Sequence, residues 1–181
     1  MNAVPLAIPP HLAERVAAAQ VRGFVGAGNS ELLDSPLLGL LASRACPAKV
    51  LIETLDLVPA WVGAVRVVVS GFHSPLEQQV LRSLLRRNGR AVKVLAHGIT
   101  SYTPPEPTLE LEAEALATGR LLVLTACAPT LKRATRATAL QRNTLVLRLS
   151  TEICAPHIAP GSPLAGLIAL HAPAQPRPRA E

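Results

Sequence analysis

The chain has 181 residues and a hydrophobic content of 49%, enough for one globular domain and too apolar for a disordered chain. Its three cysteines are widely spaced and form no C-x-x-C pair, which argues against a structural zinc site and a disulfide framework. The net charge of +6 is modest. Because no apolar run is long enough to span a membrane and no leader segment is recognisable, we expect a cytoplasmic protein without a membrane partner.

The first part of the chain alternates segments typical of helices and strands. In chain order we predict a helix over residues 10–20, a Gly-rich turn over 23–29, a short apolar strand over 37–42 and a helix after Pro47. Pro59 should interrupt or kink the last turn of that helix, because proline lacks an N–H and clashes with the preceding turn.

The clearest local signal is the sequence VRVVVSGFHSPLEQQVLRSLL at residues 65–85. Its valine run over 65–69 does not alternate with polar residues, a pattern typical of a strand covered on both faces in a parallel sheet. Ser74 is a suitable N-cap, and Glu77 three residues later completes a capping box. The helix that begins there should end at Asn88-Gly89.

The second part of the chain continues the alternation. We predict a strand over 92–96, a proline-rich turn over 102–107, a helix ending near Leu116, a strand over 121–125, a helix over 134–149 and a strand over 152–155. This order is typical of an α/β protein with crossover helices. We expect a single domain over residues 1–171 and a disordered Pro- and Arg-rich tail over residues 172–181.

Four short motifs occur in a definite order over residues 20–168. They are Ala42-Ser43-Arg44, Ser70-Gly71, Arg142-Asn143 followed by Leu147-Arg148-Leu149-Ser150, and Pro160-Gly161-Ser162. Together they resemble the Rossmann-like domain of the DNA-processing protein A (DprA) family, within the wider SLOG-type group of nucleotide- and ligand-binding domains. The segment Tyr102-Thr103-Pro104-Pro105-Glu106 is similar to the family's Tyr-Pro-Pro-Glu.

The resemblance implies a Rossmann-like, doubly wound and mostly parallel sheet flanked by helices. It also implies single-stranded DNA binding and recombinase loading, which in the family depend on dimerisation and on basic pocket residues; a homodimer is therefore one expectation. The sequence departs from the family at Ala42, which replaces Gly, at Thr144, which replaces Arg, and at Ser-Gly-Phe-His-Ser-Pro, which replaces Ser-Gly-x-Ala-x-Gly. The family's usual extra domains are not recognisable, so we expect a diverged, stand-alone domain.

The loops that follow the strands are the predicted site, because ligands of open α/β sheets bind outside the carboxyl ends of the strands. A helix N-terminus there exposes unpaired N–H groups that favour an anion, and an arginine can bind a phosphate through two parallel hydrogen bonds. The predicted phosphate- or nucleic-acid-binding residues are Ser43, Arg44, Ser70, Gly71, Phe72, His73, Arg142, Asn143, Gly161 and Ser162. Among the aromatic residues, Phe72 is the best placed to stack on a base.

Each of these residues also has a structural interpretation. Arg44 is then a surface charge at a strand end, Ser70-Gly71 a tight turn, Arg142-Asn143 a brace for a neighbouring loop, and His73 an exposed histidine. A metal site from His73, His97 and His157 would require all three loops to meet, and we predict no metal and no cofactor.

No motif supports catalysis, and the Gly23-x-x-Gly26-x-Gly28 stretch is a weak match to a dinucleotide fingerprint. Residues 116–151 contain no acid but six basic side chains, a distribution that can attract phosphates. The function we predict is binding of a phosphate, a nucleotide or single-stranded DNA at the carboxyl edge of the sheet. The alternatives are a sensor or enzyme for a small nucleotide-like ligand and a domain that only assembles with a partner.

Overall fold

The computed structural model describes residues 3–19, 21 and 23–171; the predicted tail at 172–181 lies outside them. The strands of this part of the chain are β1 (Val4–Leu6), β2 (Phe24–Gly28), β3 (Leu37–Leu40), β4 (Val67–Ser70), β5 (Arg90–Leu95), β6 (Leu121–Thr125) and β7 (Glu152–Cys154). They form one sheet in the order β1-β2-β6-β5-β4-β3-β7. All neighbours from β6 to β7 are parallel, whereas β2 runs antiparallel to both β6 and β1.

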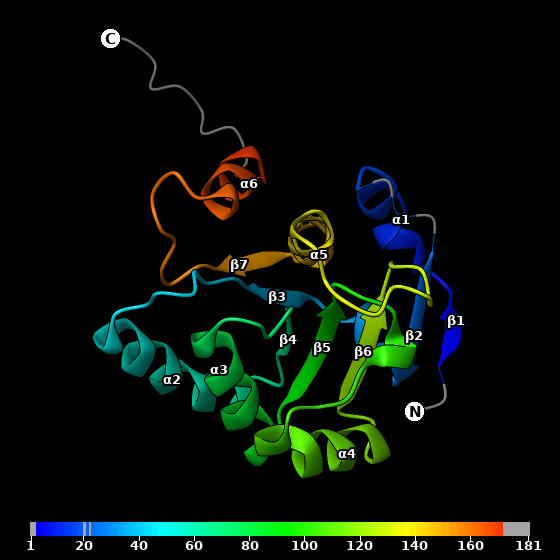
Figure 1. The fold of residues 1–181 in the computed structure, drawn as a ribbon. Helices are drawn as coiled ribbons and strands as arrows, with labels where there is room; N and C mark the ends of the chain where they lie inside the picture. Colours follow the sequence, from blue (N-terminus) through cyan, green and yellow to red (C-terminus); the bar gives the residue numbers. More distant parts are fainter. Residues whose placement is uncertain (1–2, 20, 22, 172–181) are drawn as a thin grey trace, which may run out of the picture.

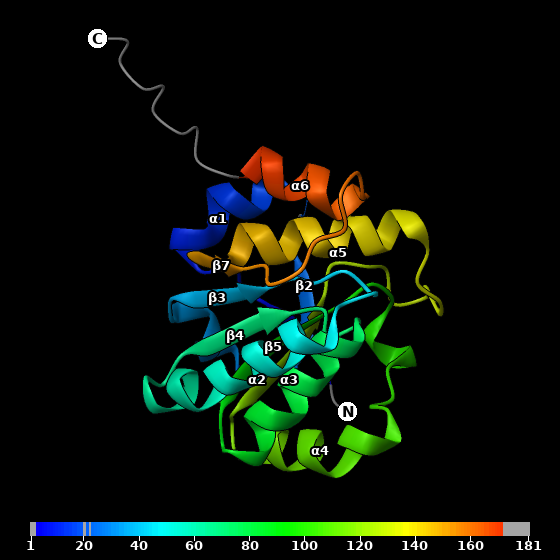
Figure 2. The same ribbon diagram turned by 90° about the vertical axis from the view of Figure 1, so that its left-hand side faces the viewer.

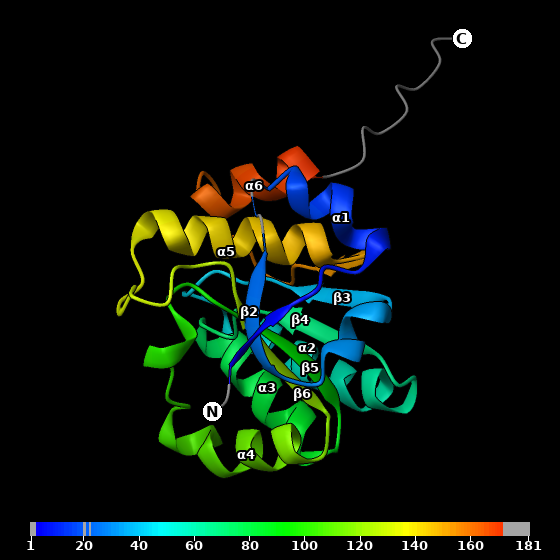
Figure 3. The ribbon, with the colours of Figure 1, turned by 90° about the vertical axis from the view of Figure 1, so that its right-hand side faces the viewer.

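Helices cover both faces of this sheet (Figure 1). They are α1 (Pro10–Ala17), α2 (Ala48–Gly63), α3 (Pro75–Arg86), α4 (Leu109–Ala117), α5 (Arg136–Leu149) and α6 (Pro163–His171). Helices α2, α3 and α4 lie on one face, and α1, α5 and α6 lie on the other, as the side views in Figures 2 and 3 also show. The predicted doubly wound, mostly parallel α/β fold is thus confirmed. No helix among the described residues is long and apolar enough to cross a membrane.

The valine run in β4 is buried on both faces, as the pattern predicts. Val68 packs in the cluster under α2 and α3, while Val67 and Val69 pack in the cluster under α1 and α5. None of the three exposes more than 1% of its surface. Val65 lies outside the strand with a φ of 54° and is exposed, so the strand begins later than predicted.

The predicted capping box is present at the start of α3. The Ser74 hydroxyl accepts a hydrogen bond from the Glu77 N–H, and the Glu77 carboxylate accepts one from the Ser74 N–H. The helix ends as predicted before Asn88, which has a φ of 59°. A short sequence signal therefore determines where this helix begins and ends.

The prediction of a Gly-rich turn over residues 23–29 is wrong, because Phe24–Gly28 is strand β2. Glycine weakens a strand signal, but it also permits close approach of a neighbouring backbone. At Gly28, where φ is 107°, a Cβ would lie 2.2 Å from the carbonyl oxygen of Leu121 on β6. The glycine is therefore required by strand pairing, which a local pattern does not reveal.

Three other features differ from the expectations. Strand β1 and helix α6 were not predicted; both are short, and the α6 sequence PLAGLIALH contains no charged residue that would mark a solvent face. Helix α2 continues through Pro59 to Gly63 without an interruption. The proline-rich segment 102–107 is irregular except for the start of a short 3₁₀ helix at Glu106–Thr108.

A buried ion pair anchors this proline-rich segment to the sheet. Lys93 on β5 donates to Glu112 on α4 at 2.8 Å, and both side chains are almost fully buried. Glu112 also accepts hydrogen bonds from the hydroxyls of Tyr102 and Thr108. Burial lowers the pKa of Lys93, and Glu112 opposes that shift by its charge and its hydrogen bond.

Substitution of Glu112 should destabilise the fold strongly. Glu112→Ala leaves the Lys93 ammonium buried without its counter-charge, and we expect the free energy of unfolding to fall by about 3–5 kcal/mol. The control is Glu53→Ala, which removes an exposed pair with Lys49 and should cost about 0.5 kcal/mol or less. Urea unfolding of both variants measures the difference; equal losses would contradict a special role for the buried pair.

Candidate functional site

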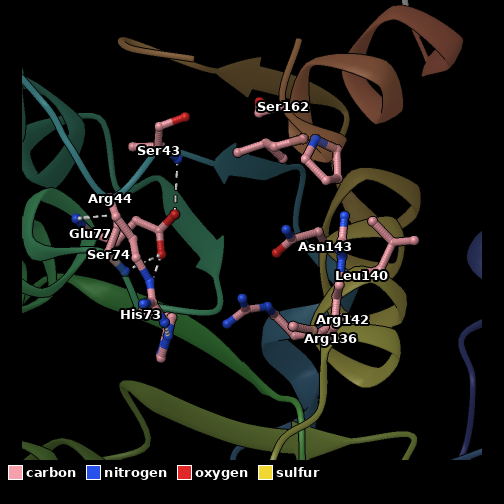
Figure 4. A pocket seen from close by; sticks show the side chains of 14 residues that line it. Ser43, Arg44, His73, Ser74, Glu77, Arg136, Leu140, Arg142, Asn143 and Ser162 are labelled. Carbon is pink, nitrogen blue, oxygen red and sulfur yellow. Dashed lines mark hydrogen bonds between the residues drawn. The ribbon is translucent and has the colours of Figure 1, made fainter. Parts of the chain in front are cut away.

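A pocket of about 350 Å³ lies between the loop after β3, the turn after β4, helix α5 and the start of α6. Six of the ten predicted residues line it: Ser43, Arg44, His73, Arg142, Asn143 and Ser162. Figure 4 shows the α5 side chains on one side of the pocket and Arg44, His73 and Glu77 on the other. Residues far apart in the sequence thus meet at the predicted edge of the sheet.

The other four predicted residues do not line this pocket. Ser70 is fully buried, and its hydroxyl accepts a hydrogen bond from the Phe72 N–H at 3.1 Å. Phe72 is only 4% exposed and packs in the core cluster, so the expectation that it stacks on a base is corrected. Gly71 lies beneath Arg142, and Gly161, with a φ of 67°, forms the turn before Ser162.

The Glu77 carboxylate joins the two loops that carry Arg44 and His73. One oxygen accepts from the Ala42 N–H at 2.9 Å, and the other accepts from the His73 and Ser74 N–H groups at 2.8 and 3.2 Å. These amides are therefore not available to an anion, contrary to the expectation of unpaired N–H groups at this helix end. Both carboxylate oxygens are used as acceptors, which makes Glu77 a positioning residue rather than a free base.

Three arginines supply positive charge to the pocket. Arg44 comes from the loop after β3, and Arg136 and Arg142 come from α5. Six residues separate the two α5 arginines, about 240° around a regular helix, yet their long side chains reach the same pocket. Arg136 was not among the predicted site residues; its spacing of seven from Asn143, two turns of helix, is the signal that would have identified it.

Arg142 is largely buried, and its position depends on Gly71. A Cβ at Gly71 would lie 2.0 Å from one terminal guanidinium nitrogen of Arg142. The Arg142 Nε is buried and has no hydrogen-bond partner among the described residues. Burial lowers the pKa of the Arg142 guanidinium, although the nearby charge of Glu77 raises it in part. The pocket therefore contains a cation whose hydrogen-bonding capacity is not fully used.

His73 lies within hydrogen-bonding distance of Arg44. The Arg44 Nη2 and the His73 Nε2 are 2.9 Å apart. A guanidinium group can only donate, so Nε2 must accept and the imidazole must be neutral, with its proton on Nδ1. Partial burial lowers the pKa of His73, and the charges of Arg142 and Arg44 lower it further, against a smaller opposing effect of Glu77.

Three helices direct their N-terminal ends towards the pocket. Ser74 caps α3, Arg136 is the first residue of α5, and Ser162 precedes α6; all three residues line the pocket. A helix N-terminus carries a partial positive charge. Ser43 fixes the loop before α6, because its hydroxyl accepts from the Ala159 N–H at 2.8 Å. Because Glu77 already occupies the amides at the start of α3, the arginines and the N-terminal ends of α5 and α6 are the features that favour a negatively charged ligand.

The histidines do not form a metal site in the part of the chain that the structure describes. No group of three or more His, Cys, Asp or Glu side chains with metal-binding geometry occurs there. His97 forms a hydrogen bond with the adjacent Gly98 carbonyl, and His157 supplies its carbonyl oxygen to the Ser43 N–H. Only His73 of the three lines the arginine pocket.

Comparison with known proteins agrees with this architecture. The structure is similar to DNA processing protein A from Streptococcus pneumoniae, with a TM-score of 0.76 and 18% identity over 94% of this chain and 59% of that chain. It is also similar to DNA processing protein A from Helicobacter pylori, with a TM-score of 0.77 and 18% identity over 94% of this chain and 78% of that chain. The structure of that protein was solved to explain how it binds single-stranded DNA. The search of curated protein sequences finds no match.

The chain thus spans 59% of the length of the S. pneumoniae protein. The amino-acid sequence also matches a protein-family model. The model of DNA recombination-mediator protein A matches residues 9–155, which include every strand of the sheet except β1. The chain therefore belongs to the DNA recombination-mediator protein A family.

Proposed function

We propose that this chain binds single-stranded DNA by holding backbone phosphate in the arginine pocket. Family membership and the single-stranded DNA binding of the H. pylori relative support the class of ligand. The observation that carries the proposal is the Arg142 guanidinium, which is largely buried and has an unpartnered Nε among the described residues.

Burying a cation without partners costs free energy, and the protein recovers part of that cost when an anion binds. Arg142 lies over Gly71, so the backbone leaves room for the guanidinium where any side chain would displace it. Arg44 and Arg136 face the same space. A phosphate is the suitable ligand because its oxygens match the parallel N–H groups of a guanidinium.

The loop before α5 extends this positive surface. Lys132 and Arg133 are exposed there, three and two residues before the N-cap Thr135 of α5. No acidic residue occurs between 116 and 151 to neutralise them. A single DNA strand with one phosphate in the pocket can therefore contact further cations along this loop with its other phosphates. This arrangement favours a polymeric ligand.

A small nucleotide-like ligand is the second candidate, and the size of the pocket favours it. A volume of about 350 Å³ lies within the range of small-molecule sites. The Glu77 carboxylate, the acid that lines this pocket, is occupied by backbone N–H groups, which leaves His73 as the titratable side chain of the lining that can exchange a proton.

Binding of fluorescent oligonucleotides of several lengths tests the first candidate. If Arg44, Arg136, Arg142, Lys132 and Arg133 all contact phosphates, the slope of log K against log salt should be about −3.5, from about 0.7 per contact. Arg44→Ala should weaken binding about tenfold and reduce the slope by about 0.7.

The matched control is Arg86→Ala. Arg86 is exposed at the opposite end of α3 from the pocket, so this variant removes the same charge without touching the site. Equal effects of the two substitutions would contradict pocket binding. Affinity independent of oligonucleotide length, with full competition by a mononucleotide, would instead favour the small ligand.

Substitutions at Arg142 should separate binding from stability. Arg142→Gln should abolish most oligonucleotide binding, yet it should leave the free energy of unfolding unchanged or raise it by about 1 kcal/mol, because it removes a poorly paired buried cation. Gly71→Ala should have the same binding defect by displacing the guanidinium. The control is Gly63→Ala, where a Cβ meets nothing within 4 Å. Strong destabilisation by Arg142→Gln would show a structural role instead.

A further inference from the structure

We propose that the arginine pocket selects a terminal phosphate monoester, such as the phosphorylated end of a DNA strand, over an internal phosphodiester. This inference rests on the proposed function of the same pocket and names the part of the nucleic acid that the pocket takes. Three features support it: the charge of the pocket, the number of its donors and the state of His73.

The charge of the pocket matches a dianion. Its lining contains the cations Arg44, Arg136 and Arg142 and the anion Glu77, so three positive charges and one negative charge leave a net charge of +2 while His73 is neutral. A phosphodiester carries one negative charge, whereas a phosphate monoester carries nearly two at neutral pH. Only the monoester neutralises the pocket.

The donors of the pocket also exceed the needs of a diester. A phosphodiester offers two terminal oxygens, and a monoester offers three strong acceptors. Arg44 and Arg142 approach the space from opposite sides, and Asn143 and Ser162 add an amide and a hydroxyl. The N-terminal ends of α5 and α6 add partial positive charge to the pocket. An end group with three free oxygens can use this surrounding set of donors.

His73 can respond to the second negative charge. In the free protein its Nε2 accepts from Arg44 at 2.9 Å, so the ring is neutral. When a phosphate takes over the Arg44 donors, Nε2 loses its donor and can bind a proton next to the anion. The charged groups that face His73 are Arg44 from the β3 loop, Arg142 from α5 and Glu77 from α3. A dianion offsets the two arginines and thereby favours the imidazolium ion.

The selectivity is tested with the unmodified protein and one DNA sequence in three forms: 5′-phosphorylated, 3′-phosphorylated and without a terminal phosphate. We expect at least one phosphorylated form to bind about tenfold more tightly at low salt, with the advantage lost in Arg142→Gln. If all three forms bind equally and all weaken in Arg142→Gln, the proposed function stands and this inference is overturned. If none binds, both are overturned.

The part played by His73 is tested by calorimetry at pH 7 in two buffers of different ionisation enthalpy. The pKa of His73 lies below its usual value of 6.5 in the free protein and should rise in the complex. The protein should therefore take up protons on binding the phosphorylated strand, and its affinity should fall as pH rises through the pKa of the complex.

The comparison variant is His73→Gln, whose amide oxygen can still accept from Arg44 and keep that side chain in position. We expect this variant to bind the phosphorylated strand without proton uptake and with a flatter pH profile between pH 6.5 and 8, a range above the second pKa of the phosphate at about 6. Equal proton uptake by both proteins would overturn the role of His73.

Discussion

The Glu77 carboxylate is the interaction on which the arrangement of the pocket depends. It accepts hydrogen bonds from the Ala42 N–H in the loop after β3 and from the His73 and Ser74 N–H groups at the start of α3. Two loops separated by about thirty residues are thereby held at a fixed distance. Arg44 and His73 lie on these two anchored loops. The fixed distance between the loops brings the two side chains into contact. The acid in the pocket thus fixes the positions of the loops that carry Arg44 and His73.

Arg142 occupies a position that does not favour the stability of the fold. Its guanidinium is held in a largely buried position by the absence of a side chain at Gly71, and its Nε lacks a partner among the described residues. Burial disfavours the charged form, and Glu77 offsets only part of this effect. A residue selected for stability alone would be apolar or paired at this position. Binding of the proposed anion would account for this unfavourable placement.

The parts of the fold that the sequence predicts well depend on local signals. The capping box at Ser74 and Glu77 and the valines of β4 each determine an element without help from distant residues. Strand β2 was mistaken for a turn because its glycines are required by contacts with β6, nearly one hundred residues away. Phe72 was misjudged for a similar reason: its place after a strand predicts the edge of the sheet, but a φ of 47° turns its side chain into the core.

The turn after β4 is also where the sequence departs from its family. The family pattern Ser-Gly-x-Ala-x-Gly reads Ser-Gly-Phe-His-Ser-Pro here, so His73 replaces Ala and Pro75 replaces Gly. Ser74, at a variable position of this pattern, caps α3, and the Glu77 carboxylate of the capping box accepts from the His73 and Ser74 N–H groups, so these amides are not available to an anion. His73 brings a titratable side chain beside two arginines. An anion in the pocket would therefore meet side-chain charge at this turn rather than these backbone N–H groups, and the proposed contact with phosphate would respond to its ionisation as well as to its shape.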